Sequence, residues 1–146
     1  MRTSPRLSLA ALTLFVAFGL SACAEKPEKR LIGKWGMDTQ AALASEKFTK
    51  MPEDQKEFAK KMIEEMGSKM IFEFQEGGKV HVEMGEMKED GEWSVKSVEG
   101  DKMVIHSKGG KPDAEGKQKE EDVTITFKGD RMIMNMKGED MTFMKK

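Results

Sequence analysis

The chain contains 146 residues, of which 35% are charged, and its 25 basic and 26 acidic side chains give a formal net charge of −1. Such a balance leaves no electrostatic reason to bind nucleic acid, which requires a basic surface. The length suits one folded domain. The single cysteine excludes an internal disulfide.

The N-terminus has the pattern of an export signal. Two arginines and no acid lie in MRTSPR, and the apolar run at 7–20 is too short for a comfortable membrane span. Small residues then lead to the lone cysteine in Leu20-Ser21-Ala22-Cys23, which resembles the lipobox of bacterial lipoproteins. This resemblance implies that residues 1–22 are a signal peptide and that Cys23 becomes the acylated mature N-terminus. The alternative is an ordinary signal peptide followed by an unrelated cysteine.

Acylation of Cys23 would hold the protein at a membrane, because two or three acyl chains, at about 0.8 kcal/mol per buried CH₂, anchor a protein durably. In the lipoprotein family an aspartate after the cysteine retains the protein in the inner membrane. Ala24 stands there instead, so the resemblance implies an outer-membrane anchor and a domain that faces the periplasm. Residues 23–30 then form a lipidated tether, whose AEKPEKR segment reaches only about 24 Å when extended. Without residues 1–22, 23 basic and 26 acidic side chains give a net charge of −3.

A short strand is predicted at 31–37, and residues 38–67 then change to helix formers. The segment DTQAALASEKF lacks β-branched runs, and Asp38 or Thr39 suits its N-cap. MPEDQKEFAKKMIEEMG is the stronger helix, with a proline suited to the first helical position and a glycine suited to the exit. Its apolar residues recur every four positions and predict a stripe that faces a core: Phe58, Met62 and Met66, with Ala59 and Ile63 beside them.

From Ser68 onward the apolar period changes to two, which predicts strands. KMIFEFQEGGKVHVEM is predicted to be a hairpin that turns at Gly77-Gly78. A second hairpin, DGEWSVKSVEGDKMVIH, turns near 99–101, and its far strand is left with two registers. Residues 107–122 form a polar surface connection. The first hairpin has one apolar face, made of the pairs Phe74–Val80, Phe72–Val82 and Met70–Met84.

The last segment, VTITFKGDRMIMNMKGEDMTFMKK, is predicted to be a three-stranded meander, which brings the total to eight strands. A KGDR turn pairs Phe127 with Met132, and a KGED turn pairs Met134 with Phe143. Every methionine of MIMNM then lies on the face that carries valine, isoleucine and phenylalanine, which favours core packing by flexible thioethers. The alternative is a soft-metal site for Cu(I), formed by Met132, Met134 and Met136, or by Met84, Met87 and His81.

Gly33-Lys34-Trp35 in the first strand is similar to the G-x-W motif of lipocalins and their calycin relatives. The two helices after this strand resemble those of the fatty-acid-binding branch, and the repeated hairpins resemble the small bacterial lipocalin-like lipoproteins. The resemblance implies a mainly β fold with an α insertion. Residues 31–146 would form a small antiparallel up-and-down barrel of about eight strands, with helices at 38–67 between the first and second strands. Within the motif, Gly33 and Trp35 are structural: Trp35 would pack across the barrel floor, where Lys145 is available as its basic partner.

An eight-stranded barrel is just wide enough for side chains or for one small ligand, so filled and ligand-binding barrels are both open. We expect a binding module for a small apolar or amphipathic molecule. The alternative is an envelope module that binds a partner protein, or has a structural role, around a filled core. The inward set includes Trp35 and Met70, and the candidate ligand-binding lining is Phe72, Phe74, Trp93, Phe127, Met132, Met134 and Phe143.

Catalytic signatures are absent from the sequence, which contains neither a G-x-S-x-G elbow nor an H-E-x-x-H helix. The two histidines, His81 and His106, belong to different hairpins, and no dedicated carboxylate partner is evident for either. We therefore expect no enzymatic activity, no cofactor and no bound metal. The expected partners are membrane lipid and a small hydrophobic ligand.

Overall fold

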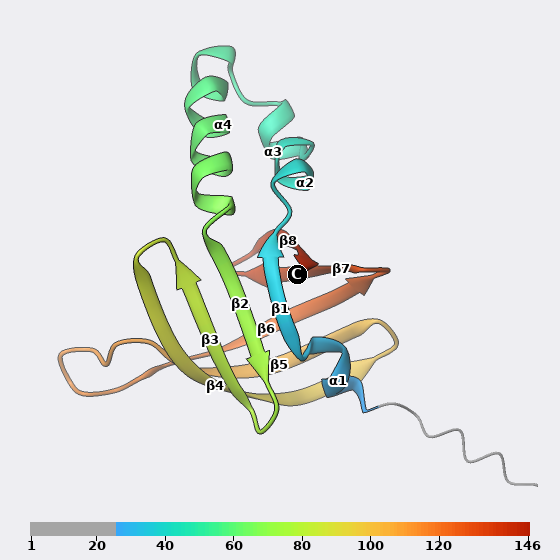
Figure 1. Cartoon of the computed structure of the whole chain (residues 1–146), viewed down its shortest axis with the longest axis vertical. Coiled ribbons are helices and arrows are strands. Elements are labelled where there is room, and N and C mark those ends of the chain that lie inside the picture. Colours follow the sequence, from blue (N-terminus) through green and yellow to red (C-terminus); the bar gives the residue numbers. More distant parts are fainter. Residues whose placement is uncertain (1–25) are drawn as a thin grey trace, which may run out of the picture.

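The computed structural model describes residues 26–146. The predicted signal peptide at 1–22 and the predicted lipidation at Cys23 lie outside these residues. Figure 1 shows a β-barrel from which a pair of antiparallel helical segments projects as an arm. In chain order the elements are α1 (Pro27–Leu31), β1 (Gly33–Met37), α2 (Thr39–Leu43), α3 (Glu46–Thr49), α4 (Glu53–Gly67), β2 (Met70–Gln75), β3 (Lys79–Met84), β4 (Met87–Glu99), β5 (Lys102–Gly109), β6 (Lys119–Lys128), β7 (Arg131–Met136) and β8 (Glu139–Lys145).

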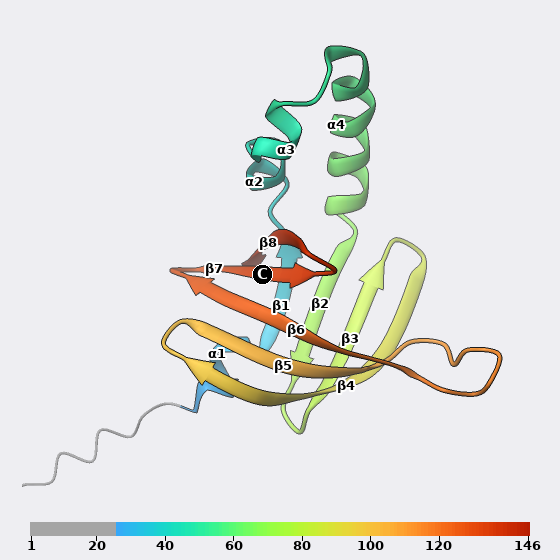
Figure 2. The ribbon, with the colours of Figure 1, turned by 180° about the vertical axis from the view of Figure 1, so that it is seen from behind.

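The sheet is a closed barrel in which the strands follow one another in the order β1 to β8, and β1 also pairs with β8. Every pairing is antiparallel, from β1–β2 through to β7–β8. Strand β4, 13 residues long, curves from the side that holds β2 and β3 to the side that holds β5 and β6 (Figure 2). The prediction of an eight-stranded up-and-down barrel with helices between its first two strands is therefore confirmed.

Alternate, mostly apolar residues of the strands occupy most of the barrel interior. Aromatic rings run through it in edge-to-face and tilted contacts, as aromatic pairs prefer: Phe72 meets Phe143 at 5.2 Å between ring centroids, and Phe74 meets Trp93 at 5.7 Å. The buried core is Leu31, Trp35, Phe74, Val80, Trp93, Met103, Ile105, Val123, Ile125, Phe127, Met132, Met134 and Phe143.

The methionines of MIMNM belong to this core face. Met132 and Met134 are 0% and 2% exposed, and Met136 packs against the core with part of its surface accessible. In β7 these residues alternate with Ile133 and Asn135, which take the outer face. The interpretation of the motif as the buried side of a strand is confirmed for Met132 and Met134.

One end of the barrel is closed by α1, where the sequence predicted an extended tether. Leu31 is fully buried, and its carbonyl oxygen accepts a hydrogen bond of 2.7 Å from Trp35 Nε1. Arg30 lies 4.5 Å above the ring of Phe127, and Lys145 Nζ lies 5.3 Å from the ring of Trp35. The last residues of the predicted tether therefore form a helical turn from Pro27 onward, because burial of Leu31 against the indole stabilises it.

The two central hairpins have well-defined registers. The first pairs Phe74 with Val80 and Phe72 with Val82, as predicted. The register of the second hairpin, which the sequence left open, places the turn at Gly100-Asp101, since Glu99 pairs with Lys102. An irregularity between Val95 and Ser97 keeps the apolar residues of β4 on the inner face on both sides of it. One extra residue on one strand is how a β-bulge absorbs such a mismatch.

Two boundaries in the C-terminal half differ from the prediction. Strand β5 ends at Gly109 and strand β6 begins at Lys119, so the connection expected at 107–122 is confined to 110–118. Phe143 pairs with Met132 and not with Met134, because β7 and β8 join through a two-residue turn at Lys137-Gly138. Since the difference is an even number of residues, each side chain keeps its predicted face.

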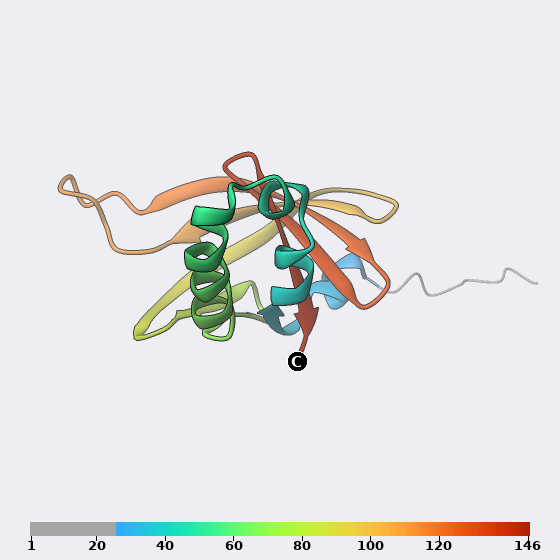
Figure 3. The same cartoon turned by 90° about the horizontal axis from the view of Figure 1, so that it is seen from above.

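The helical arm consists of α2 and α3 packed beside α4 (Figure 3). The helix predicted over DTQAALASEKF is broken at Ser45, whose hydroxyl caps α3 by accepting from the Phe48 N–H. The apolar stripe of α4 does not face the core as predicted: Phe58, Met62 and Met66 are 70%, 43% and 49% exposed. The periodicity correctly identifies an apolar face of α4, but α2 covers only the edge of that face. Gly67 is the one buried residue of α4.

Asp38 joins the arm to the barrel. Its Oδ1 accepts a hydrogen bond of 2.9 Å from the Ala41 N–H and so caps α2. Its Oδ2 lies 3.3 Å from Nε of Arg131, at the start of β7, without hydrogen-bond geometry. Of the two predicted caps, Asp38 is therefore the correct one.

Among residues 26–146, none of the helices has the length and apolar character of a membrane-spanning segment.

Candidate functional site

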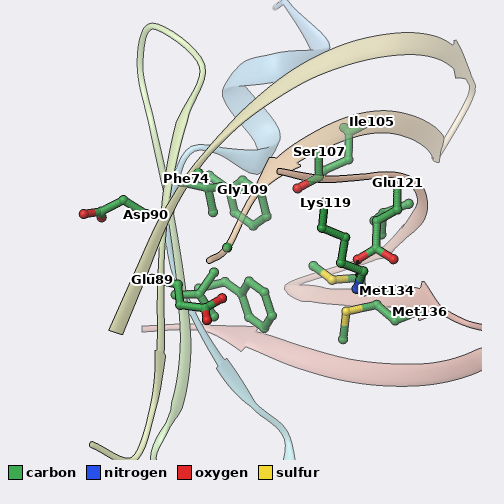
Figure 4. Close-up of a pocket in the computed structure, with 16 residues that line it drawn as sticks. Phe74, Glu89, Asp90, Ile105, Ser107, Gly109, Lys119, Glu121, Met134 and Met136 are labelled. Carbon is green, nitrogen blue, oxygen red and sulfur yellow. Dashed lines mark hydrogen bonds and ion pairs between the residues drawn. The ribbon is translucent and has the colours of Figure 1, made fainter. Parts of the chain in front are cut away.

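A pocket of about 160 Å³ opens among the inward faces of β2 to β7 (Figure 4). It lies toward the end of β5 that holds Gly109. Helix α1 lies at the opposite end of the β4–β5 hairpin, where Arg30 forms an ion pair with Asp101 in the turn. Phe72, Phe74 and Met134 form part of its wall. The other apolar residues of the wall are Val80, Val82, Ile105, Val123 and Met136.

The space exists because two glycines face each other where side chains would otherwise fill the barrel. Gly91 on β4 pairs with Gly109 on β5, between Val80 on one side and Lys119 on the other. The two strands approach so closely that a Cβ on Gly109 would lie 2.8 Å from the Gly91 Cα. A Cβ on Gly91 would lie 2.8 Å from the carbonyl oxygen of Lys108. This strand pair therefore tolerates no side chain at either position, and the interior beside it stays open.

Polar groups gather at the mouth of the pocket. Glu89, Lys119 and Glu121 all occupy positions of the inward-facing set, since they alternate with pocket-lining or buried residues along their strands. Lys119 Nζ lies 3.4 Å from Glu121 Oε1. Ser107, opposite Glu121, adds a hydroxyl. An apolar interior with a few polar groups at its rim is the usual make-up of a small-molecule site.

The candidate lining predicted from the sequence divides into two groups. Phe72, Phe74 and Met134 line the pocket. The other four residues pack in the buried core away from it and do not contribute to its wall: Trp93, Phe127, Met132 and Phe143.

Sequence reasoning missed the residues that create and rim the pocket. Gly109 falls in the predicted connection at 107–122, and Gly91 falls in the predicted second hairpin without an assigned role, although a glycine inside a strand signals a close backbone approach. Glu89 was missed because it precedes the predicted second hairpin, which begins at Asp90. Its alternation with Gly91 and Trp93 would have placed it on the inward face, had β4 been predicted to begin at Met87.

Each histidine has a carboxylate partner, contrary to the sequence-based prediction. His81 Nδ1 lies 2.6 Å from Asp90 on the outer face of the β3–β4 hairpin, and His106 Nδ1 lies 2.9 Å from Asp122 on the outer face of β5–β6. The sequence could not pair them because each partner lies on the neighbouring strand. Both pairs lie on the side of the sheet away from the pocket interior.

These outer-face contacts change the acidity of three groups. The hydrogen bond that His81 donates to the Asp90 carboxylate raises the pKa of His81 above its ordinary value. Lys88 lowers the pKa of Glu83, which also lies 3.3 Å from His81. Lys96, followed by His106, lowers the pKa of Asp122.

The two alternative copper sites differ in their surroundings. In the first, Met132 and Met134 are surrounded by core side chains. In the second, Met84 pairs with Met87 across the β3–β4 turn, where Met87 is 60% exposed. His81 lies on the outer face of β3, opposite in alternation to Met84. Within residues 26–146, no three histidine, cysteine, aspartate or glutamate side chains are placed to hold a metal ion.

The closed antiparallel barrel is consistent with a calycin-like fold. Gly33 and Trp35, the residues of the G-x-W motif, lie at the closed end, with Trp35 buried beside Leu31 and Lys145. A scan against protein-family models found no match, and searches of curated proteins and of solved structures found none either.

Proposed function

We propose that this chain is a non-catalytic lipoprotein of the bacterial envelope whose calycin-like barrel binds a small amphipathic or apolar molecule. Acylated Cys23 would anchor it in the outer membrane, facing the periplasm. The pocket carries the ligand-binding part of the proposal, since it combines an apolar wall with a polar rim. A dry protein cavity of roughly 150 Å³ binds benzene. A pocket of about 160 Å³ therefore suits one ring or a short alkyl chain.

The wall also supports adaptation to a guest. Met134 and Met136 present flexible, polarizable thioethers to the space, as Figure 4 shows. Unbranched methionine side chains repack at low cost. The site can therefore accept alkyl groups somewhat longer than the empty volume suggests.

Filling the pocket tests the binding proposal. Val82→Phe places a ring in the space, and Ile133→Phe places a ring on the outer face of β7, where Ile133 pairs with Thr126 and Thr142. Titration calorimetry with hexanol should detect binding to the unmodified protein and to the Ile133 variant, but not to the Val82 variant. Equal binding by all three proteins, or binding by none, would contradict the proposal.

The anchor has its own test. Metabolic labelling with an alkyne analogue of palmitate should mark the protein in cells, and Cys23→Ser should remove the label and release the protein from membranes. Labelling that survives this substitution would reject Cys23 as the anchor.

The exposed stripe of α4 favours a second function, in which the arm binds a partner protein. Phe58 is 70% exposed on an arm that is not buried against the barrel, and exposed apolar patches mark interaction sites. A photocrosslinking amino acid in place of Phe58 should give a specific adduct in cells. The same group in place of Lys60, on the polar side of the helix, should not. Equal yields at both positions would rule out a docking role for the stripe.

A further inference from the structure

The charges at the pocket mouth are unevenly balanced. Lys119 is within 3.4 Å of Glu121 and offsets that carboxylate. Glu89 has no basic side chain within ion-pair distance among residues 26–146. Its Oε2 lies 3.5 Å from the position that a Cβ would occupy on Gly110, so the carboxylate extends across the mouth toward the β5–β6 connection.

The neighbouring aspartate does not contribute to this mouth. Asp90 also borders the pocket, but its side chain points away from the cavity in Figure 4 and lies 2.6 Å from His81. The inward-facing ionisable groups are therefore two carboxylates and one ammonium, which leaves one negative charge at the entrance to an apolar space.

Two phenylalanines of the pocket wall lie two strands away from this charge. Glu89 pairs across the strands with Val82, which pairs with Phe72. Phe72 in turn stacks on Phe74, with ring centroids 6.3 Å apart and an interplanar angle of 13°. A cation beside Glu89 gains from the carboxylate, and the apolar group that it carries contacts the rings and aliphatic side chains of the wall. An anion there meets two carboxylates and only one ammonium.

We propose that the pocket selects a cationic amphiphile, with the alkyl or aromatic part among the phenylalanine, valine and methionine side chains and an ammonium group at Glu89. This inference rests on the proposed function, because it names the ligand class for the same pocket. The selectivity comes from one carboxylate at the entrance, whereas the affinity comes from the apolar wall.

A matched series of probes separates these two contributions. Hexylamine, hexanol and hexanoate share one alkyl chain and differ in charge, and each is titrated against the full-length protein by calorimetry. Hexylamine should bind more tightly than hexanol by about twofold to fivefold, and hexanoate should bind least, as a partly exposed ion pair predicts. The advantage of hexylamine should shrink as salt is added, because salt screens the charges at the mouth.

Three charge-removing variants localise the effect. Glu89→Gln should remove the preference for hexylamine and leave hexanol binding unchanged. Glu92→Gln, on the outer face of the same strand, is the matched control and should alter neither. Lys119→Gln should strengthen hexylamine binding, because it leaves Glu121 without its partner.

The outcomes distinguish this inference from the function on which it rests. Equal binding of hexylamine and hexanol, insensitive to Glu89→Gln, would overturn the cationic preference and leave the pocket as a site for neutral guests. Tightest binding of hexanoate, lost in Lys119→Gln, would overturn it in favour of an anionic ligand. Failure of all three probes to bind would overturn both proposals.

Discussion

Replacing two methionines of the same strand by alanine should have different consequences, because only one of them lines the pocket. Met132 and Met134 are 0% and 2% exposed, and both side chains point into the barrel. A buried Met→Ala change costs about 2–5 kcal/mol of unfolding free energy, depending on the cavity that remains. Met132 pairs with Phe127 on one side and Phe143 on the other, so its removal opens a closed void.

We expect Met132→Ala to cost roughly 3–5 kcal/mol, at the upper end of that range. Met134 already faces empty space on one side, and a side chain without neighbours there has fewer dispersion contacts to lose. Met134→Ala should therefore cost about 2–3 kcal/mol. It should also enlarge the existing pocket, so that octanol gains affinity relative to hexanol. Met132→Ala should leave that ratio unchanged.

Urea denaturation followed by the fluorescence of the two buried tryptophans measures both costs, and calorimetry measures the ligand ratio. Met87→Ala is the control, since Met87 is 60% exposed and should change stability by less than about 0.5 kcal/mol. The reasoning would be refuted if Met132→Ala cost no more than the control. It would also be refuted if Met132→Ala, and not Met134→Ala, changed the ligand ratio.

Substitutions at three other residues test single contacts. An NMR titration should place the pKa of His81 above 6.5, and Asp90→Asn should lower that pKa; an unchanged pKa in the variant would contradict the pairing. The stabilisation from this pair should be full below pH 6.5 and lost as pH rises through the raised pKa. Asp38→Ala should reduce the unfolding free energy by about 1–2 kcal/mol. Asp38→Asn should reduce it by less, because the amide oxygen can still accept the capping hydrogen bond; equal losses in the two variants would contradict the capping role. Gly109→Ala should cost about 1–3 kcal/mol by overpacking against the Gly91 backbone, and a neutral result in thermal melts would disprove the close approach.

The barrel could be predicted because the alternation of apolar and polar residues assigns every strand residue to a face. A register error of two residues leaves each side chain on the same face of the sheet. The predicted β7–β8 register was therefore wrong, while the residues predicted to point into the barrel were right. The turn itself was misjudged because Lys137 takes a φ of 53° beside Gly138, and lysine gives no signal for that conformation.

The arm and the pocket could not be predicted for different reasons. The stripe at Phe58 identifies an apolar face of α4, but what covers such a face depends on where the helix packs. The pocket depends on Gly91 and Gly109 meeting across two strands, which requires the register of β4 and β5. The bulge after Val95 fixes this register, and neither turn chemistry nor alternation reveals it.

The most direct measurement of the central claim uses methyl groups as reporters inside the barrel. In protein labelled with ¹³C at the methionine methyls, titration with hexanol should shift the resonances of Met134 and Met136, which line the pocket. The resonances of Met132, in the closed core, and of Met62, on the exposed arm, should stay in place. Shifts confined to Met62, or no shift at any methyl group, would show that the barrel does not take up an apolar guest.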